Sequence, residues 1–162
     1  MSYPPIRYEK DTGEMSATLR RAGQDPELLM DTGSASYLAT GASTGGDFGL
    51  YRWDMSGPPT GPGAHFHRTM SESFFVLSGV VRILSGRDWI DAGAGDFVHV
   101  PPGGVHGFRN ESGAAASMLI LFTPGAPREA YFEGLARIAR SGERPSAQEL
   151  DDFYRRHDNV WL

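Results

Sequence analysis

The sequence predicts an all-β fold, a sandwich or barrel of short strands, followed by two helices. Three observations support this. Gly and Pro account for 21 and 11 of the 162 residues, only 22% of the residues are charged, and short apolar runs recur at regular spacing. A length of 162 residues is enough for one domain with a sizeable core.

The expected strands begin after an ambiguous amino-terminal segment. Residues 36–41 (SYLATG) and 48–55 (FGLYRWDM) are rich in aromatic and branched side chains and flank the turn-forming sequence ASTGGD. Between residues 72 and 122, short turn sequences separate further candidates, which are ESFFVLSG, VVRIL, DWIDA, DFVHVP, HGFRN and ASMLILF. This regular spacing is typical of a sandwich or barrel.

The segment 48–55 shows the alternation of a half-buried strand. Tyr51, Trp53 and Met55 share one face of the expected strand. Arg52 and Asp54 share the other face, so we expect the aromatic face to point inward.

Two helices are expected after the last strand. The sequence REAYFEGLARIAR spaces its apolar residues as a helix does, and a second helix should begin at Ser146, with Ser146 as N-cap and Glu149 three residues later. We therefore divide the chain into an N-terminal arm or strand of the barrel (1–35), a barrel core (36–124) and C-terminal helices packed on the barrel (125–162). No chemical role is assigned to the helices.

Charge and composition exclude several functions. The net charge of −5 and the scattered basic residues argue against nucleic-acid binding. No apolar run approaches the roughly 18 residues of a membrane span, and the start lacks a secretory signal, so we expect a cytoplasmic protein without a membrane partner. The absence of cysteine means that any metal must be held by His, Asp or Glu.

Four side chains form a candidate metal site. His65 and His67 lie two residues apart, so both project from one face of an extended strand, and Glu72 follows closely. The turn PPGG can bring His106 to the same interior, whereas His99 should point away because its apolar neighbours better fit the core face. Three imidazoles and one carboxylate suit one divalent transition metal ion per chain, with Fe, Ni, Mn, Co, Cu and Zn all left open.

These residues carry a resemblance to the cupin superfamily. The chain contains H-x-H-x4-E-x6-G from His65 to Gly79 and G-x5-P-x-G-x2-H-x3-N from Gly95 to Asn110. One departure is Pro59, where the family pattern has glycine. The resemblance implies a cupin jelly-roll β-barrel with the metal ligands named above. The later sequence FTPGAPREAYFEGL is similar to single-domain cupins of the quercetin 2,3-dioxygenase group.

Strand alternation predicts an apolar substrate pocket beside the metal. Phe74 and Val76 share the face of Glu72, and Phe108 shares that of His106. The predicted substrate-binding side chains are Tyr51, Trp53, Met55, Phe74, Val76 and Phe108. The arginines of the strands, Arg52, Arg82 and Arg109, have the opposite parity, so we expect no inward cation and a flat aromatic or polyketide-like substrate.

Three functions remain open at this point. The resemblance implies a metal-dependent dioxygenase that acts with O2 on a quercetin-type aromatic substrate, with Glu72 as the catalytic base. The alternatives are a non-redox cyclase or isomerase for a polyketide-like substrate, in which the metal is a Lewis acid, and a metal-containing protein that only binds or senses a small molecule. We also expect a homodimer, because a small barrel of this kind leaves an apolar sheet face uncovered.

Overall fold

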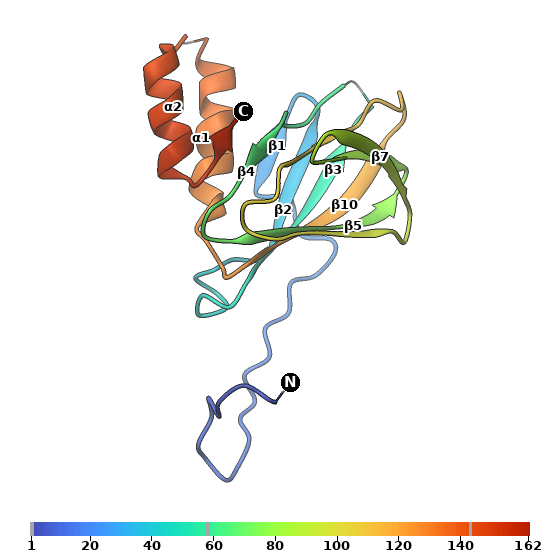
Figure 1. The fold of residues 1–162 in the computed structure, drawn as a ribbon. Helices are drawn as coiled ribbons and strands as arrows, with labels where there is room; N and C mark the ends of the chain where they lie inside the picture. Colours follow the sequence, from blue (N-terminus) through green and yellow to red (C-terminus); the bar gives the residue numbers. More distant parts are fainter. Residues whose placement is uncertain (1, 58, 143) are drawn as a thin grey trace.

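Two antiparallel sheets pack face to face around one hydrophobic core (Figure 1). The computed structural model describes residues 2–57, 59–142 and 144–162. Within these residues, the strands of the first sheet are, in order across the sheet, β1 (Leu28–Met30), β2 (Gly33–Ala39), β3 (Gly49–Met55), β10 (Ala116–Thr123), β5 (Ser71–Ser78) and β8 (Phe97–Val100). Those of the second sheet are β11 (Val160–Trp161), β4 (His65–Phe66), β9 (His106–Arg109), β6 (Val80–Ser85) and β7 (Asp88–Gly93).

The predicted jelly-roll barrel is not closed, because among the described residues no ladder joins the two sheets. The strands β4 and β11 have two residues each, too few to continue pairing around a corner. The chain instead passes between the sheets at turns. Gly79 separates β5 from β6 with a φ of 72°, and a Cβ there would lie 2.5 Å from the carbonyl oxygen of Ala115. The fold is therefore an all-β sandwich with open edges.

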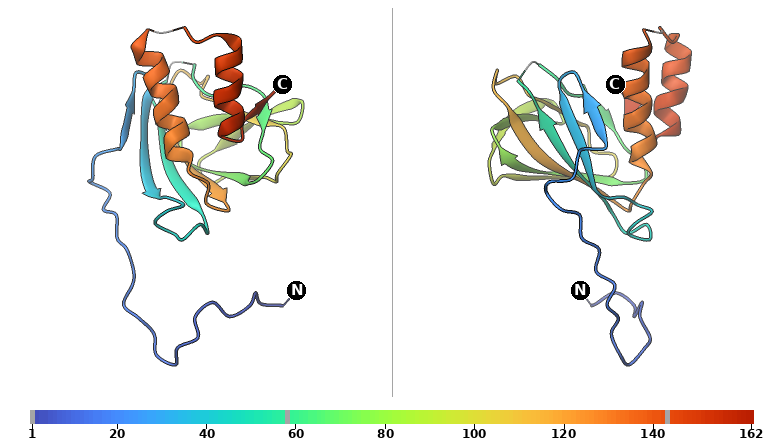
Figure 2. Two further views of the ribbon diagram at one scale, coloured as in Figure 1. Left: turned by 90° about the vertical axis from the view of Figure 1, so that its left-hand side faces the viewer. Right: turned by 180° about the vertical axis from the view of Figure 1, so that it is seen from behind.

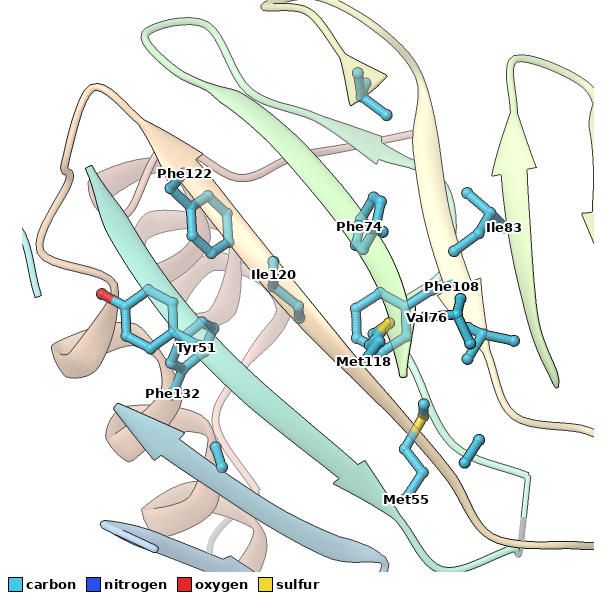
Figure 3. Packing of buried hydrophobic residues seen from close by; sticks show 14 of the residues in the cluster. Tyr51, Met55, Phe74, Val76, Ile83, Phe108, Met118, Ile120, Phe122 and Phe132 are labelled. Carbon is cyan, nitrogen blue, oxygen red and sulfur yellow. The ribbon is translucent and has the colours of Figure 1, made fainter. Parts of the chain in front are cut away.

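Alternation along the strands decides which side chains form the core. Tyr51 and Met55 on β3 are buried, and Trp53 is half-buried. Arg52 and Asp54 lie on the other face, where the Arg52 Nη2 is 2.9 Å from Asp54 Oδ1. The predicted inward face of this strand is confirmed (Figure 3).

The predicted strand segments from residue 36 onward each contain an observed strand. The structure adds the short strand β11 near the carboxyl end, which the sequence did not suggest, and it contains the short strand β1 in the segment expected as an N-terminal arm or strand. The predicted boundary at residue 36 falls inside β2, which begins at Gly33. Apolar periodicity cannot detect strands of two or three residues.

The two expected helices are α1 (Arg128–Ser141) and α2 (Ala147–Arg156), which lie side by side next to the sheets (Figure 1). The capping box at the start of α2 is confirmed. The Ser146 hydroxyl oxygen accepts from the Glu149 amide, and the Glu149 carboxylate accepts from the Ser146 amide. Tyr131 and Phe132 of α1 pack into the core, so α1 is part of the hydrophobic core.

Residues 2–27 contain no helix or strand; the first part of this segment extends away from the sheets (Figures 1 and 2), whereas residues 20–26 lie beside β2 and β3. Most of their side chains are exposed to solvent. None of the helices in the described part of the chain has the length and apolar character needed to cross a membrane.

Candidate metal centre

The four predicted ligands meet at one buried point between the two sheets. Their candidate ligand atoms all lie within 4.8 Å of one another. The Oε2 atom of Glu72 is 2.9 Å from the Nε2 atoms of both His67 and His106. Each of the four residues is at most 4% exposed. The structure thus brings together His65, His67, Glu72 and His106.

Strand pairing explains how residues distant in sequence meet here. His65 on β4 is the direct partner of His106 on β9, so their side chains are neighbours across the second sheet. His67 follows immediately after β4, and Glu72 reaches the same point from β5 of the first sheet. The cluster therefore requires the two sheets to pack face to face.

Backbone carbonyls orient all three imidazoles. Nδ1 of His65 lies 2.9 Å from the carbonyl oxygen of Gly63, and Nδ1 of His106 lies 2.9 Å from that of Gly104. Nδ1 of His67 lies 2.6 Å from the carbonyl oxygen of Asp158. A carbonyl oxygen only accepts hydrogen bonds, so each Nδ1 carries the hydrogen. Each Nε2 is thereby the nitrogen available to a metal ion.

The charges in the cluster favour a metal. Burial disfavours ionisation of Glu72, but the hydrogen bonds from His106 and His67 outweigh it and hold the pKa of this carboxyl well below its usual range. Burial lowers the pKa of His65 to about 4, so this imidazole is neutral at pH 7. Burial also opposes protonation of His106, yet its hydrogen bond with Glu72 raises its pKa overall. A metal ion would take the place of the proton between His106 and Glu72.

The donor set fits a divalent transition metal. Three imidazole nitrogens and one carboxylate oxygen, with no sulfur, form a site that could hold iron, nickel, manganese, cobalt, copper or zinc. His99, by contrast, is exposed on the outer face of β8, where its Nδ1 is 2.9 Å from Ser73 Oγ. Its predicted direction away from the cluster is confirmed.

The segment after α2 contacts the cluster and supports it. The sequence did not predict this support. Asp158 has a φ of 55°, and its carboxylate accepts hydrogen bonds from the amides of Arg68 and Thr69, at 2.9 Å each, and from the Thr69 hydroxyl at 2.7 Å. Its carbonyl holds His67, as described above. Trp161 on β11 pairs with His65, and their rings lie 5.1 Å apart. The sequence Asp158–Asn159 was an available signal, because these residue types tolerate the left-handed conformation.

A cavity of about 270 Å³ adjoins the cluster and is reached by His65 and Glu72. Of the predicted substrate-binding residues, Trp53 and Phe108 line it. The other four lie in the core instead, and they are Tyr51, Met55, Phe74 and Val76 (Figure 3). Alternation shows which face of a strand points inward, but it does not show how far along the strand the cavity reaches.

Helix α1 explains why Tyr51 lies in the core and does not line the cavity. The ring of Phe132 packs against Tyr51 with 5.2 Å between ring centroids, and the Tyr51 hydroxyl donates to Glu129 at 2.5 Å. The helices and the segment after them supply a large part of the cavity wall: Arg128, Tyr131, Phe132, Leu135, Tyr154, Asn159 and Trp161. The sequence assigned no role to the helices, and in the structure they help to form the cavity.

The expected absence of an inward cation is wrong. Arg128, the first residue of α1, lines the cavity and is only 3% exposed. Its guanidinium carbon lies 4.4 Å from the ring centroid of Tyr131 and 4.9 Å from that of Phe122. The three strand arginines considered from the sequence do point outward, where Arg82, for example, pairs with Asp91 at 3.0 Å. The inward cation was missed because it comes from a helix.

Comparisons with known proteins agree with this architecture. Residues 54–122 match the family model of the cupin domain. KdgF from Halomonas sp. has a similar structure, with a TM-score of 0.60 and 13% identity over 70% of this chain and 98% of its own. The polyketide cyclase RemF from Streptomyces resistomycificus has a TM-score of 0.57 and 22% identity, over 70% and 82% of the two chains.

A third similar structure is described as a sugar phosphate isomerase from a cupin superfamily, from Silicibacter pomeroyi. Its TM-score is 0.50 and its identity 26%, over 58% of this chain and 60% of its own. No curated protein sequence matches the chain.

The matched region contains all four residues of the cluster, and the neighbours share the fold. Together these findings support a place for the chain in the cupin superfamily. Fold and site define a two-sheet β sandwich with a buried cluster of three histidines and one glutamate that could bind a metal ion.

His65→Ala or His106→Ala should reduce the bound metal to near zero, because each removes one of four ligands. The sheets should remain folded, since turns and the apolar core hold them together. Elemental analysis and circular dichroism of the purified variants measure the two effects. His99→Ala is the matched control and should keep its metal; unchanged metal content in either ligand variant would contradict the site.

Asp158→Asn should weaken metal binding on the order of 10-fold or more, the usual scale for the loss of a group that orients a ligand. The amide keeps the backbone conformation accessible but replaces one acceptor oxygen with a donor. Competition with a chelator measures the affinity. Asp152→Asn, on the exposed face of α2, is the control and should bind metal normally. Equal affinities of the two variants would remove the support assigned to Asp158.

Proposed function

We propose that the protein is a metal-dependent cupin dioxygenase that acts on a small hydroxylated aromatic substrate of the quercetin type. The observation that carries this proposal is the position of Glu72, which belongs both to the cluster and to the wall of an aromatic cavity. Two of the cavity's aromatic side chains, Trp53 and Phe108, pack edge to face with 6.4 Å between ring centroids. Such a wall suits a flat ring.

The residues of the site have two roles, which are metal binding and proton transfer. The four cluster residues would hold a divalent metal, which supplies a Lewis acid for a substrate oxygen and a centre for reaction with O2. Glu72 contacts the imidazoles through Oε2, and within the described residues Oε1 makes no hydrogen bond. This second oxygen can accept the proton of a substrate hydroxyl. Both atoms of O2 enter the product, so no external reductant is needed.

A non-redox cyclase or isomerase is the second candidate. The buried Arg128 favours it, since a cation beside a Lewis acid would stabilise an enolate oxygen of a polyketide-like substrate without O2. The fold similarity to a polyketide cyclase is compatible with this reaction but does not select it.

Oxygen uptake separates the candidates. The protein, loaded in turn with each candidate metal, is mixed with a panel of flavonols and simpler polyphenols in an oxygen electrode. A dioxygenase should consume one O2 per substrate and place both atoms of labelled O2 in the product. Substrate conversion without O2 uptake would support the cyclase or isomerase, and binding without conversion would support a small-molecule binding protein.

Glu72→Gln should separate metal binding from turnover. The amide oxygen can still coordinate, so a substantial share of the metal should remain. The amide cannot accept a proton, so turnover per bound metal should fall on the order of 10²-fold or more. Metal content and oxygen uptake are measured on the same samples. Nearly full activity per metal would show that Glu72 is not the base.

We also propose a homodimer formed through the outer face of the first sheet. Phe75 and Phe97 are direct partners across β5 and β8 and are 39% and 62% exposed, and Leu77 on the same face is 39% exposed. The strand β8 is an edge of this sheet. A second copy of the chain would cover both the apolar face and the edge.

Light scattering should return about twice the chain mass of 17.6 kDa at micromolar concentration. Phe97→Glu should shift the protein toward the monomer, because it places a charge in the apolar face. Ile90→Glu is the matched control, since Ile90 is also exposed (43%) but lies on the second sheet. A mass near 17.6 kDa for the unmodified chain would overturn the dimer.

A further inference from the structure

The wall of the cavity opposite the strands contains buried polar atoms that lack partners. Arg128 Nε and Asn159 Oδ1 are buried and have no hydrogen-bond partner among the described residues. Both side chains line the cavity that Glu72 also lines. A buried polar atom without a partner destabilises the folded state, so two in one cavity point to a ligand that satisfies them.

Arg128 is only partly used by the fold. Its Nη1 donates to the carbonyl oxygen of His157 at 2.7 Å, which links α1 to the chain after α2. The aromatic rings of Phe122, Tyr131 and Phe132 surround the guanidinium at 4.4–5.5 Å and exclude water from it. The Nε atom, by contrast, donates no hydrogen bond to any of the described residues. A desolvated guanidinium with a free donor is a strong binding group for a carboxylate.

Asn159 and Tyr131 continue this polar wall. Nδ2 of Asn159 donates to the Tyr131 hydroxyl oxygen at 3.0 Å, which leaves the hydroxyl hydrogen without an acceptor among the described residues. The backbone amide of Asn159 is fixed by the Tyr154 carbonyl oxygen at 2.9 Å. The wall therefore offers two donors, from Arg128 and Tyr131, and one acceptor, from Asn159.

We propose that Arg128 binds a carboxylate of the substrate, and that the substrate class is a hydroxylated aromatic acid. Arg128 Nε and the Tyr131 hydroxyl donate to the carboxylate, and Asn159 Oδ1 accepts from a ring hydroxyl. The inference rests on the proposed function and deepens it, because it names the substrate class of the same site. A second hydroxyl of the ring is then directed toward Glu72.

Size and charge favour this class over others. A cavity of about 270 Å³ lies just below the usual range of roughly 300–1,000 Å³, which favours a small aromatic molecule. Arg128 is the only arginine or lysine among the described residues that line the cavity, and Glu72 lines the same cavity. One cation matches one carboxylate, whereas a phosphate would bring a second negative charge close to Glu72.

The alternative is that Arg128 only joins α1 to His157. Such a structural role uses Nη1 alone and predicts equal effects of an Arg128 substitution on charged and neutral ligands. The binding role predicts a selective loss for the charged ligand. A matched pair of ligands therefore distinguishes the two roles.

The experiment uses 3-hydroxybenzoate and its neutral analogue 3-hydroxybenzamide with the zinc-loaded full chain, measured by calorimetry. The unmodified protein should bind the acid on the order of 10-fold more tightly, the scale of one charge-assisted hydrogen bond. In Arg128→Gln this preference should disappear while the affinity for the amide stays nearly unchanged. Arg52→Gln, an exposed arginine paired with Asp54, is the control and should keep the preference.

Two results would overturn the proposal: no preference for the acid in the unmodified protein, or the same preference in Arg128→Gln. If Arg128→Gln fails to fold, the preference of the unmodified protein for the acid still tests the proposal. Arg128→Lys then provides the second comparison, and its preference for the acid should be reduced. Repeating the titrations without metal shows how much of the preference belongs to the ion. Oxygen uptake plays no part in this test, so its outcome is independent of whether the reaction is a dioxygenation.

Discussion

The site depends on keeping an ionised carboxylate among three imidazoles in the space between two sheets. Glu72 is almost completely buried, and a buried charge is stable only when neighbouring groups compensate it. His67 and His106 do so directly, and backbone carbonyls fix the direction of every ring. Since these groups come from both sheets and from the chain after α2, correct packing of all three parts is a condition for the site.

The part of the site that could be predicted from the sequence is the part that local rules govern. Motif spacing identified the four cluster residues, and alternation along β3 identified its inward face. The roles of Arg128 and Asp158 were not predicted, because they depend on where α1 and α2 pack, and no local pattern encodes that packing. The capping box of α2 is local and was predicted correctly, while the two-residue strand β11 is too short to leave a periodic signal.

The residues that could hold the metal and those that would choose the substrate come from different parts of the chain. The cupin match covers residues 54–122 and contains the whole cluster. Arg128, Tyr131 and Asn159 lie after it, on α1 and in the segment that follows α2. Similarity to the cupin domain therefore informs the possible metal chemistry more than the substrate, and proteins with the same cluster can act on different molecules.

The late position of Asp158 in the chain also sets the order in which the sheets and the site can form during synthesis. The residues up to 122 contain nearly all of both sheets, with β11 still to come, and can bring the four cluster side chains near one another before the helices exist. The carbonyl that holds His67 is translated some 36 residues after that region ends, so the ring gains its final direction only late. The nascent chain can thus reach a stage in which most of both sheets is assembled and the site is unfinished, and the final orientation of the cluster requires the segment after α2.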